Sequence, residues 1–556
     1  MTEILSLRPI AAVLVSVIAI PLIIAARQRP DVREAVTMIT ALTKVGLVAS
    51  MLPGVLAGDV YVTEIVTFVS DIAFVLRVDA LGMVFGLLAS SLWVITSLYS
   101  IGYMRGLAEH SQTRYFAAFA ASLSTAIGVA FAGNLVTLFI FYELLTIATY
   151  PLVAHNEDSE ARAAGRKYLT YTFLGGVAVL AGVVLVFSMT GTTTFTAGGI
   201  AGLAEADPAI ARLAFALLAG GFGVKAALMP THSWLPDAMV APTPVSGLLH
   251  AVAVVKSGVF GIARVVLDIF GPETMADLGV GVVLAAVAAF TLLTASVIAL
   301  RKDHLKRRLA YSTISQLSYI VLGLGVLSGE AIVGGLLHIP AHAFMKLTLF
   351  FCAGAIHVET HTDYISEMAG IGKRMPLTMT AFAVAAAGMA GIPLIAGFVS
   401  KWYILIGSVN SGQGIFAIVL LVSGMLNIAY FWPIVYQAFF ETPDDHDGKP
   451  VVEAPLGGRL TDESTTEGAV AADGGDPAEG HDTTDEHGDH DDGHHHGGPG
   501  PDGWDERDWR GGESTWFMLG PIMTAAGGAI ALGLAPATFV FLELIQLVAE
   551  NVGVVG

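Results

Sequence analysis

The sequence predicts an all-α, polytopic membrane protein with about 14 transmembrane helices. Of its 556 residues, 54% are hydrophobic and only 13% are charged, whereas soluble domains carry roughly 25% charged residues. A helix that spans a bilayer needs about 20 mostly apolar residues. Such stretches lie at 8–26, 36–57, 78–103, 115–132, 134–154, 168–189, 209–230, 241–267, 278–300, 309–327, 331–356, 376–406, 414–440 and 515–547.

The first stretch is predicted to be a retained span. It has no basic region before it and no A-x-A-like cleavage site after it, which a signal peptide would have. The distribution of positive charge orients the spans, because short cytoplasmic loops are enriched in Lys and Arg. The loops after spans 1, 3, 5, 9 and 11 hold most of the bases: Arg27, Arg29, Arg33, Arg105, Arg114, Arg162, Arg166, Lys167, Arg301, Lys302, Lys306, Arg307, Arg308, Lys373 and Arg374. We therefore expect a multi-pass protein of the cell membrane with both termini outside.

Residues 441–513 differ in composition from the rest of the chain. They hold 22 Asp and Glu but 4 Lys and Arg, so they account for nearly all of the net charge of −19. Few aliphatic residues and many Gly, Thr and His predict a disordered cytoplasmic loop. Its histidines also leave a metal-binding role open. The expected organisation is a membrane domain over 1–440, this acidic, His-rich loop over 441–513, and the last span with the C-terminus over 514–556.

Prolines interrupt two of the predicted spans. Pro230 ends the seventh span and Pro393 lies inside the twelfth, and proline removes a helical hydrogen bond. Broken helices five spans apart are typical of transporters built from inverted repeats. We expect spans 4–8 to match spans 9–13, while two unrelated proline kinks remain the alternative.

Ionisable side chains inside the predicted spans are the main functional signal. A Lys or Asp at the bilayer centre costs about 2.5–3.5 kcal/mol on insertion scales, so such groups are paired or act on ions. The candidates are Lys44, Glu143, Lys225, His250, Lys256, His338, His342, Lys346 and Lys401. Lys44 has neither a broken helix nor a titratable neighbour, and it is left unassigned.

Glu143 and Lys225 are expected to form a gate. Each is isolated from other charges in its own span, and a pair at about 4 Å would be worth about 4 kcal/mol at an effective dielectric of 20. Moving Glu143 away would favour proton release from Lys225. A static buried ion pair is the alternative.

A second group of candidates forms a predicted proton relay. His338, His342 and Lys346 recur at i, i+4 and i+8 and so share one helix face. His250 and Lys256 are six residues apart on span 8, which predicts different faces and about 9 Å along the axis. Lys401 follows the second break, either in the relay or as an interfacial residue. A metal site formed by the histidines is the competing interpretation.

Three stretches resemble the antiporter-like, proton-translocating membrane subunits, which include Mrp-type Na⁺/H⁺ antiporter subunits D and A and the large membrane subunits of complex I. They are THSWLPDAMVAPTPVSGLLHAVAVVKSGVFGIAR (231–264), GLLHIPAHAFMKLTLFFCAG (335–354) and GIPLIAGFVSK (391–401). The resemblance implies two inverted five-helix repeats with broken helices 7 and 12. It also implies a proton pathway of Glu143, Lys225, His250, Lys256, His338, His342, Lys346 and Lys401.

The function implied is a proton-translocating subunit of a multi-subunit monovalent cation/proton antiporter. Its expected partners are other membrane subunits, the lipid bilayer and protons, with passage of Na⁺ left open, and nucleic acid is not among them. Two alternatives stay open: a proton-pumping subunit of a complex I-like respiratory complex, and a membrane partner of an inorganic-carbon uptake complex. No cofactor, catalytic residue or resident metal is expected, and the single cysteine, Cys352, excludes thiolate clusters.

Overall fold

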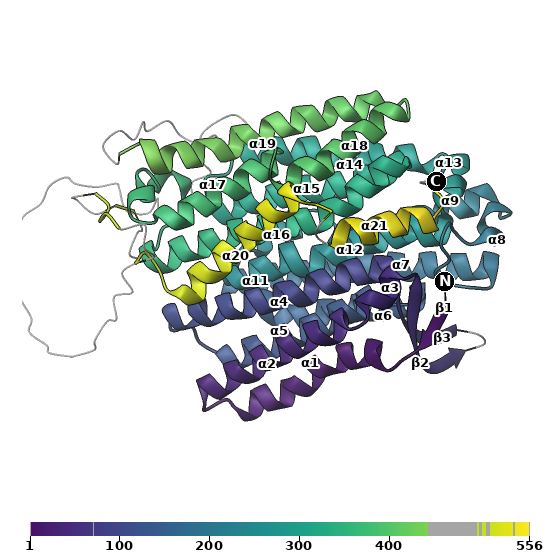
Figure 1. Cartoon of the computed structure of the whole chain (residues 1–556), viewed down its shortest axis with the longest axis horizontal. Coiled ribbons are helices and arrows are strands. Elements are labelled where there is room, and N and C mark those ends of the chain that lie inside the picture. The colour runs from purple at the N-terminus through teal and green to yellow at the C-terminus, as the bar shows by residue number, and fades with distance from the viewer. Residues whose placement is uncertain are drawn as a thin grey trace, which may run out of the picture.

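The computed structural model describes residues 2–69, 72–442, 498–499, 503–507, 512–537 and 540–554. It is a bundle of long helices lying side by side (Figure 1). Eleven helices in the described ranges are long and apolar enough to cross a membrane. These are α1 (Arg8–Ala25), α2 (Pro30–Ala49, continuing to Leu56), α4 (Ala80–Gly106), α6 (Leu135–Val153), α7 (Ser159–Thr190), α9 (Pro208–Lys225), α14 (Val280–Leu300), α15 (Leu305–Val326), α16 (Gly329–Thr360), α19 (Gly414–Phe440) and α20 (Trp516–Leu534). A further long helix, α5 (Gln112–Ala130), is less apolar.

The other expected spans are built from shorter pieces. The eighth is α11 (Thr243–Gly247), η2 (Leu248–Val252), α12 (Val254–Arg264) and η3 (Val265–Phe270), and the twelfth is α17 (Pro376–Ala390) with α18 (Ala396–Asn410). The seventh continues from α9 into α10 (Trp234–Asp237) and η1 (Ala238–Val240), and the last from α20 into α21 (Val540–Asn551). The connecting elements are α3 (Leu52–Leu56), α8 (Ala201–Ala204), α13 (Pro272–Leu278), η4 (Ile365–Glu367) and η5 (Ile371–Lys373).

The core lies around α15 and α16. In the apolar part of each of these helices 94% of the residues are buried, against 33% in α1. Helices α14, α18 and α20 pack against them. The polar side chains of α15 and α16 are therefore held inside protein, where they need protein partners.

A small sheet, not predicted from the sequence, lies at one end of the bundle. Strands β1 (Thr2–Leu5) and β2 (Asp59–Val69) are parallel, and β2 pairs antiparallel with β3 (Ile72–Val78). The β-branched residues of β2 suit a strand, of which residues 60–63 are buried and 64–67 are exposed. In Figure 1 the N-terminus lies beside β1 and the C-terminus lies at the same end of the bundle, and α21 contacts α3 beside the sheet.

Both predicted helix breaks are present. Helix α9 ends at Lys225, and an irregular stretch leads to α10. Helix α17 ends at Ala390, where Gly391 adopts φ +90°, and α18 begins at Ala396. Indole Nε1 of Trp234 donates to the carbonyl of Val224 at 2.9 Å, so the first break is closed by a side chain from beyond it.

The eighth span has an interruption that was not predicted. Leu248–Val252 form a π-helical turn, and Ala253 leaves the helical region with φ −119° and ψ −72°. A π turn rotates the residues after it relative to those before it. His250 lies in the turn and Lys256 lies after it, so a straight-helix estimate of their faces does not apply.

The predicted acidic loop lies mostly outside the described residues, so its expected disorder and its metal binding stay predictions. Its described parts contact the body. Trp504 donates to the carbonyl of Ala369 at 2.7 Å, and the amide of Arg507 donates to the carbonyl of Lys373 at 2.9 Å. The end of the 441–513 segment is therefore attached to the loop before α17.

Glu513 fixes the start of the last span onto the twelfth. Its buried carboxylate accepts from the amides of Leu377 and Thr378 at 2.8 and 2.7 Å and from the Thr378 hydroxyl at 2.6 Å. These amides begin α17, where an acidic group is favourable. At the other end of α20, a Cβ on Gly533 would lie 2.3 Å from the carbonyl carbon of Ile395. Helix α20 thus contacts α17 at its first turn and at its break.

Candidate functional site

A direct hydrogen bond joins two of the predicted residues across the bundle. Lys256 Nζ on α12 lies 2.7 Å from His342 Nδ1 on α16, and both side chains are fully buried. No carboxylate in the described residues pairs with Lys256. The lysine therefore relies on an imidazole nitrogen, a group that accepts and returns protons.

His338 lies one turn before His342 and connects α16 to two other helices. The ring centroids of the two histidines are 6.1 Å apart. His338 Nε2 lies 2.9 Å from Gln316 Oε1 on α15, and Nδ1 lies 2.8 Å from Ser400 Oγ on α18. Both ring nitrogens are occupied, so the orientation of this ring is fixed by its neighbours.

Lys401 reaches back across the second helix break. Its Nζ donates to the carbonyl of Met389 at 2.5 Å and lies 4.5 Å from the centre of the Tyr319 ring. The side-chain amide of Gln316 donates to the same carbonyl at 3.5 Å. Gln316 and the Met389 carbonyl therefore link His338 to Lys401. Lys401 also lines a cavity of about 320 Å³ with Gly391 and Trp402.

Lys346 extends the same stripe of α16 toward the opposite end of the bundle. Its Nζ donates to Ser312 Oγ at 2.5 Å and to the carbonyl of Leu309 at 3.0 Å, both on α15. The Phe350 and Phe431 ring centres lie 5.9 and 5.8 Å from the ammonium group. The predicted stripe of His338, His342 and Lys346 is thus fully buried and faces α12 and α15.

His250 and Lys256 face the same helix, contrary to the expectation of different faces. The His250 ring lies 4.7 Å from the Phe350 ring of α16, while Lys256 contacts His342 on that helix. The π-helical turn and Ala253 lie between the two residues, so straight-helix spacing does not describe their directions. Neither ring nitrogen of His250 has a hydrogen-bond partner in the described part of the chain, so an internal water is needed to satisfy it.

Glu143 and Lys225 do not form the predicted direct ion pair in this structure. Instead Lys225 Nζ donates to the backbone carbonyl of Tyr142, and it lies 3.5 Å from the centre of the Tyr142 ring. Glu143 Oε1 is buried and has no hydrogen-bond partner among the described residues. The two charges still interact electrostatically. The contact was mispredicted because a backbone carbonyl, which no sequence pattern reveals, holds the ammonium group.

Gly176 makes room for the Glu143 carboxylate. A Cβ at this position of α7 would lie 2.0 Å from Glu143 Oε1. Tight packing also places the first break against the eighth span, because a Cβ on Gly258 would lie 2.3 Å from the amide nitrogen of Ala226. The side chains of Lys225 and Lys256 therefore leave from two backbones in direct contact.

Several polar residues of the site were not predicted. Gln316, Ser312 and Ser400 carry no charge. Hydroxyl and amide side chains like theirs are common where transmembrane helices pack against one another. The signal that could have found the first two is spacing, since Leu309, Ser312 and Gln316 share one face of α15. Lys44, left unassigned, is fully buried and donates to the carbonyl of Leu123 at 3.2 Å.

A charged cluster near the sheet was also missed. Arg264 on α12 binds both carboxylate oxygens of Asp79 at 2.7 Å and Asp268 at 2.7 Å. Asp79 caps the N-terminus of α4 through the amide of Gly82 at 2.8 Å. Two acids pair with this arginine, so it ties α4 to α12 and does not belong to the buried row of Lys346, Lys256, His342, His338 and Lys401.

The row as a whole can pass protons along a defined sequence of groups. Lys256 is hydrogen-bonded to His342 and His338 to Gln316, while the Gln316 amide and Lys401 both donate to the Met389 carbonyl. Each lysine or histidine can take either protonation state. The gap between the two histidine rings is wider than one hydrogen bond, so a water must bridge it.

Comparison with known proteins agrees with this architecture. Residues 132–427 match the family described as NADH:quinone oxidoreductase/Mrp antiporter, TM. The chain is 35% identical over 353 residues to NADH-quinone oxidoreductase subunit N of Desulforudis audaxviator, which covers 62% of this chain and 68% of that protein. It is 34% identical over 420 residues to the A-type subunit of the Na⁺/H⁺ antiporter of Alkalihalophilus pseudofirmus, covering 69% of this chain and 50% of that protein.

The fold is shared with a solved structure. A chain in the structure of the Mrp complex from a Dietzia species superposes with a TM-score of 0.76 and 22% identity, and 98% of each chain is covered. Like these proteins, the chain is a multi-pass membrane protein. The matched segment includes Glu143, both helix breaks and the whole row through Lys401. The chain belongs to the NADH:quinone oxidoreductase/Mrp antiporter transmembrane family.

Proposed function

We propose that this chain is the proton-translocating subunit of a multi-subunit, Mrp-type monovalent cation/proton antiporter. The observation that carries the proposal is the connected row of buried titratable groups, with the Lys256–His342 hydrogen bond at its centre. Buried lysines without carboxylate partners are costly. A row of them along one interior is explained by proton transfer better than by stability.

The order of the row supports a pathway through the second half of the bundle. Lys346 contacts Leu309 and Ser312, near the start of α15 and the basic Arg301–Arg308 loop. Lys401 lies at the other extreme, beside a helix break and a cavity. In the proposal, protons enter from the cytoplasm near His250, Lys256 and Lys346. They pass His342 and His338 and leave through Lys401.

Glu143 and Lys225 act as the gate in this proposal. Lys225 is held by a carbonyl one residue before Glu143, so a small rotation of either side chain makes or breaks a charge contact. Forming the ion pair stabilises protonated Lys225, and breaking it favours proton release toward Lys256. In the proposal, a neighbouring subunit drives this step.

We further propose that the protein resides in the cell membrane with both termini outside. The termini lie at the same end of the bundle (Figure 1), and the basic loops lie at the other. Antiporter subunits and respiratory membrane subunits among the relatives are named as parts of larger assemblies. The proposed partners are accordingly other membrane subunits.

Proton flux in proteoliposomes tests the function. The intact complex is reconstituted, a Na⁺ or K⁺ gradient is imposed, and internal pH is followed with a fluorescent dye. Lys225→Ala and Lys401→Ala are expected to abolish cation-driven flux. Lys44→Met, a buried lysine outside the row, is the matched control and should transport normally. Wild-type flux in both row variants would refute the proposal.

A complex I-like respiratory subunit is the second candidate. It is favoured by the 35% identity to a quinone oxidoreductase subunit N over 68% of that protein. The row would then be driven by redox chemistry in a partner. Purification of the native assembly decides between the two: iron–sulfur and quinone-reducing subunits would indicate the respiratory complex, and small membrane subunits without redox centres would indicate the antiporter.

A further inference from the structure

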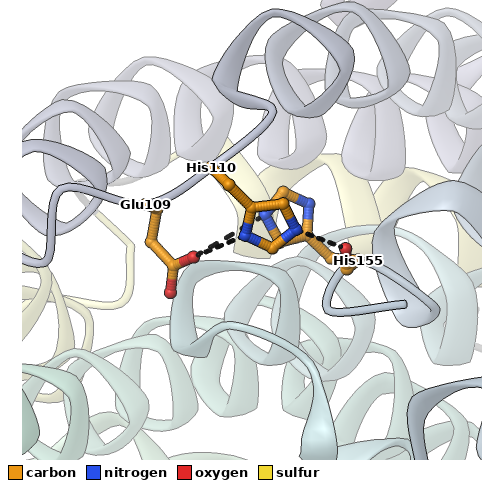
Figure 2. A group of neighbouring side chains, drawn as sticks. All are labelled: Glu109, His110 and His155. Carbon is orange, nitrogen blue, oxygen red and sulfur yellow. Dashed lines mark hydrogen bonds and ion pairs between the residues drawn. The ribbon is translucent and has the colours of Figure 1, made fainter. Parts of the chain in front are cut away.

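A cluster of three metal-ligating side chains lies at the end of the bundle that carries the basic loops, away from the row. It consists of Glu109 and His110, in the loop between α4 and α5, and His155, directly after α6. Figure 2 shows the two imidazoles and the carboxylate turned toward one another. The three ligand atoms lie within 4.8 Å of one another.

The hydrogen bonding of His110 leaves one of its ring nitrogens, a hydrogen-bond acceptor, facing the carboxylate of Glu109. His110 Nε2 lies 3.1 Å from the carbonyl of His155, which can only accept, so Nε2 carries the proton. In a neutral ring, Nδ1 then presents a lone pair, and it lies 3.5 Å from Glu109 Oε2. A lone pair facing a carboxylate oxygen is unfavourable unless a cation or a proton lies between them.

His155 brings a third acceptor to the same point. Its Nε2 lies 3.9 Å from Glu109 Oε2. Its side chain is 0% exposed, and neither ring nitrogen has a hydrogen-bond partner in the described residues. A buried ring nitrogen without a partner therefore lies beside the Glu109 carboxylate.

The surroundings hold the two histidine rings in place. Arg114 donates to the carbonyl of His155 at 2.8 Å and pairs with Glu157, which neutralises its charge. The edge of Tyr115 packs on His155 with ring centroids 5.8 Å apart. A backbone carbonyl that binds the second nitrogen of a ligating histidine is a common feature of metal sites.

We propose that Glu109, His110 and His155 form a binding site for a divalent transition-metal ion of the Zn²⁺ class. Two imidazoles and one carboxylate are a common ligand set for zinc, with a fourth position for water. Tetrahedral bonds of about 2.0–2.1 Å place ligand atoms about 3.3 Å apart. The two histidine–carboxylate separations are 3.5 and 3.9 Å, and all three ligand atoms lie within 4.8 Å of one another, so the side chains must rotate inward to bind an ion. A bound ion would tie the 107–111 loop to the end of α6, the helix of Glu143.

Metal titration of the full-length protein tests the site, but the six histidines at 481–496 could also bind metal. The background is therefore a full-length variant in which His481, His487, His490, His494, His495 and His496 are all serine, purified without a histidine tag. Zn²⁺ binding is measured by calorimetry and by the rise in melting temperature. X-ray absorption of the zinc-loaded protein should show two imidazoles.

The background protein is expected to bind one Zn²⁺ at this site. Glu109→Gln and His110→Asn should each weaken binding by about tenfold or more. These side chains are 20% and 49% exposed, so both variants should fold, while His155→Asn carries a greater risk. His361→Asn, in another loop, should leave binding unchanged. Unchanged binding in both ligand variants, or no binding by the background protein, overturns the proposal. Absence of Zn²⁺ binding by the background protein would mean that a proton on His110, and not a metal ion, lies between His110 and Glu109.

Discussion

Lys256 Nζ and His342 Nδ1 are 2.7 Å apart, and this single hydrogen bond connects the eighth span to the eleventh. Each of these side chains can bind a proton, and in this hydrogen bond the two side chains share a single proton. Replacing Lys256 with Met or His342 with Gln should reduce cation-driven proton flux by about tenfold or more. The double variant should be no worse, because residues that act as a unit are non-additive. Flux in proteoliposomes measures all three. Independent, multiplying losses would show that the two residues serve separate steps.

Gly176→Ala should impair transport without removing any ionisable group. The added methyl would lie 2.0 Å from Glu143 Oε1, so the carboxylate must leave its present position. If Glu143 gates Lys225, its displacement changes cation-driven flux several-fold. Gly220→Ala is the control, since its added methyl meets nothing within 4 Å. Equal transport by the two alanine variants would remove Glu143 from the gate.

Gln316→Leu should interrupt the row between His338 and Lys401. The amide touches both His338 Nε2 and the carbonyl that holds Lys401. Leucine has a similar volume but neither donor nor acceptor, so proton flux should fall while the melting temperature changes by only a few degrees. Gln316→Glu, which keeps an acceptor for His338, should retain more flux than leucine. The reverse order would place the proton pathway elsewhere.

Glu513→Gln should lower stability more than transport. The carboxylate accepts three hydrogen bonds at the start of α17. Losing its charge at a helix N-terminus should cost about 1–2 kcal/mol. Thermal unfolding followed by tryptophan fluorescence reports the change. Glu506→Gln, at an exposed position, is the control and should melt with the wild type.

Low pH should destabilise the loop between α14 and α15 through His304. Burial, and then Lys306, lower the pKa of His304 to about 4 from its ordinary value of 6.5. The unfolded chain therefore binds more protons than the folded one between these values, and stability falls as the pH drops through this window. His304→Gln should flatten the pH dependence of the melting temperature between pH 6.5 and about 4. His361→Gln should keep the wild-type slope.

The spans, both helix breaks and the eight candidate pathway residues could be picked out from the sequence because each has a local signal. Apolar length marks a span, and an uncompensated charge within it marks a buried polar site. The pairing of β1 was missed because its partner strand lies more than 50 residues away, and such pairing is not local. The π turn at His250 was missed because no residue type in Leu248–Val252 marks it.

Other features that the sequence did not reveal concern which group a residue contacts, and not where the residue lies in the chain. Lys225 binds the Tyr142 carbonyl instead of the Glu143 carboxylate, and every residue offers such a carbonyl. Gln316 is an ordinary polar residue until α15 packs against α16. Glu109, His110 and His155 come from two separate loops, so only the packing of α4 against α5 and of α5 against α6 brings them together.

The attachment of α20 to α17 has a mechanical consequence. One end of α20 is bound to the first turn of α17 through Glu513, and the other lies against Ile395 at the break through Gly533. A helix that is held at both ends by its neighbour restricts how far that neighbour can bend or slide. Sliding or tilting of α17 would therefore be resisted by α20, which also packs against α4 and α16. Lys401 lies at that break, and its side chain reaches back over it to the carbonyl of Met389.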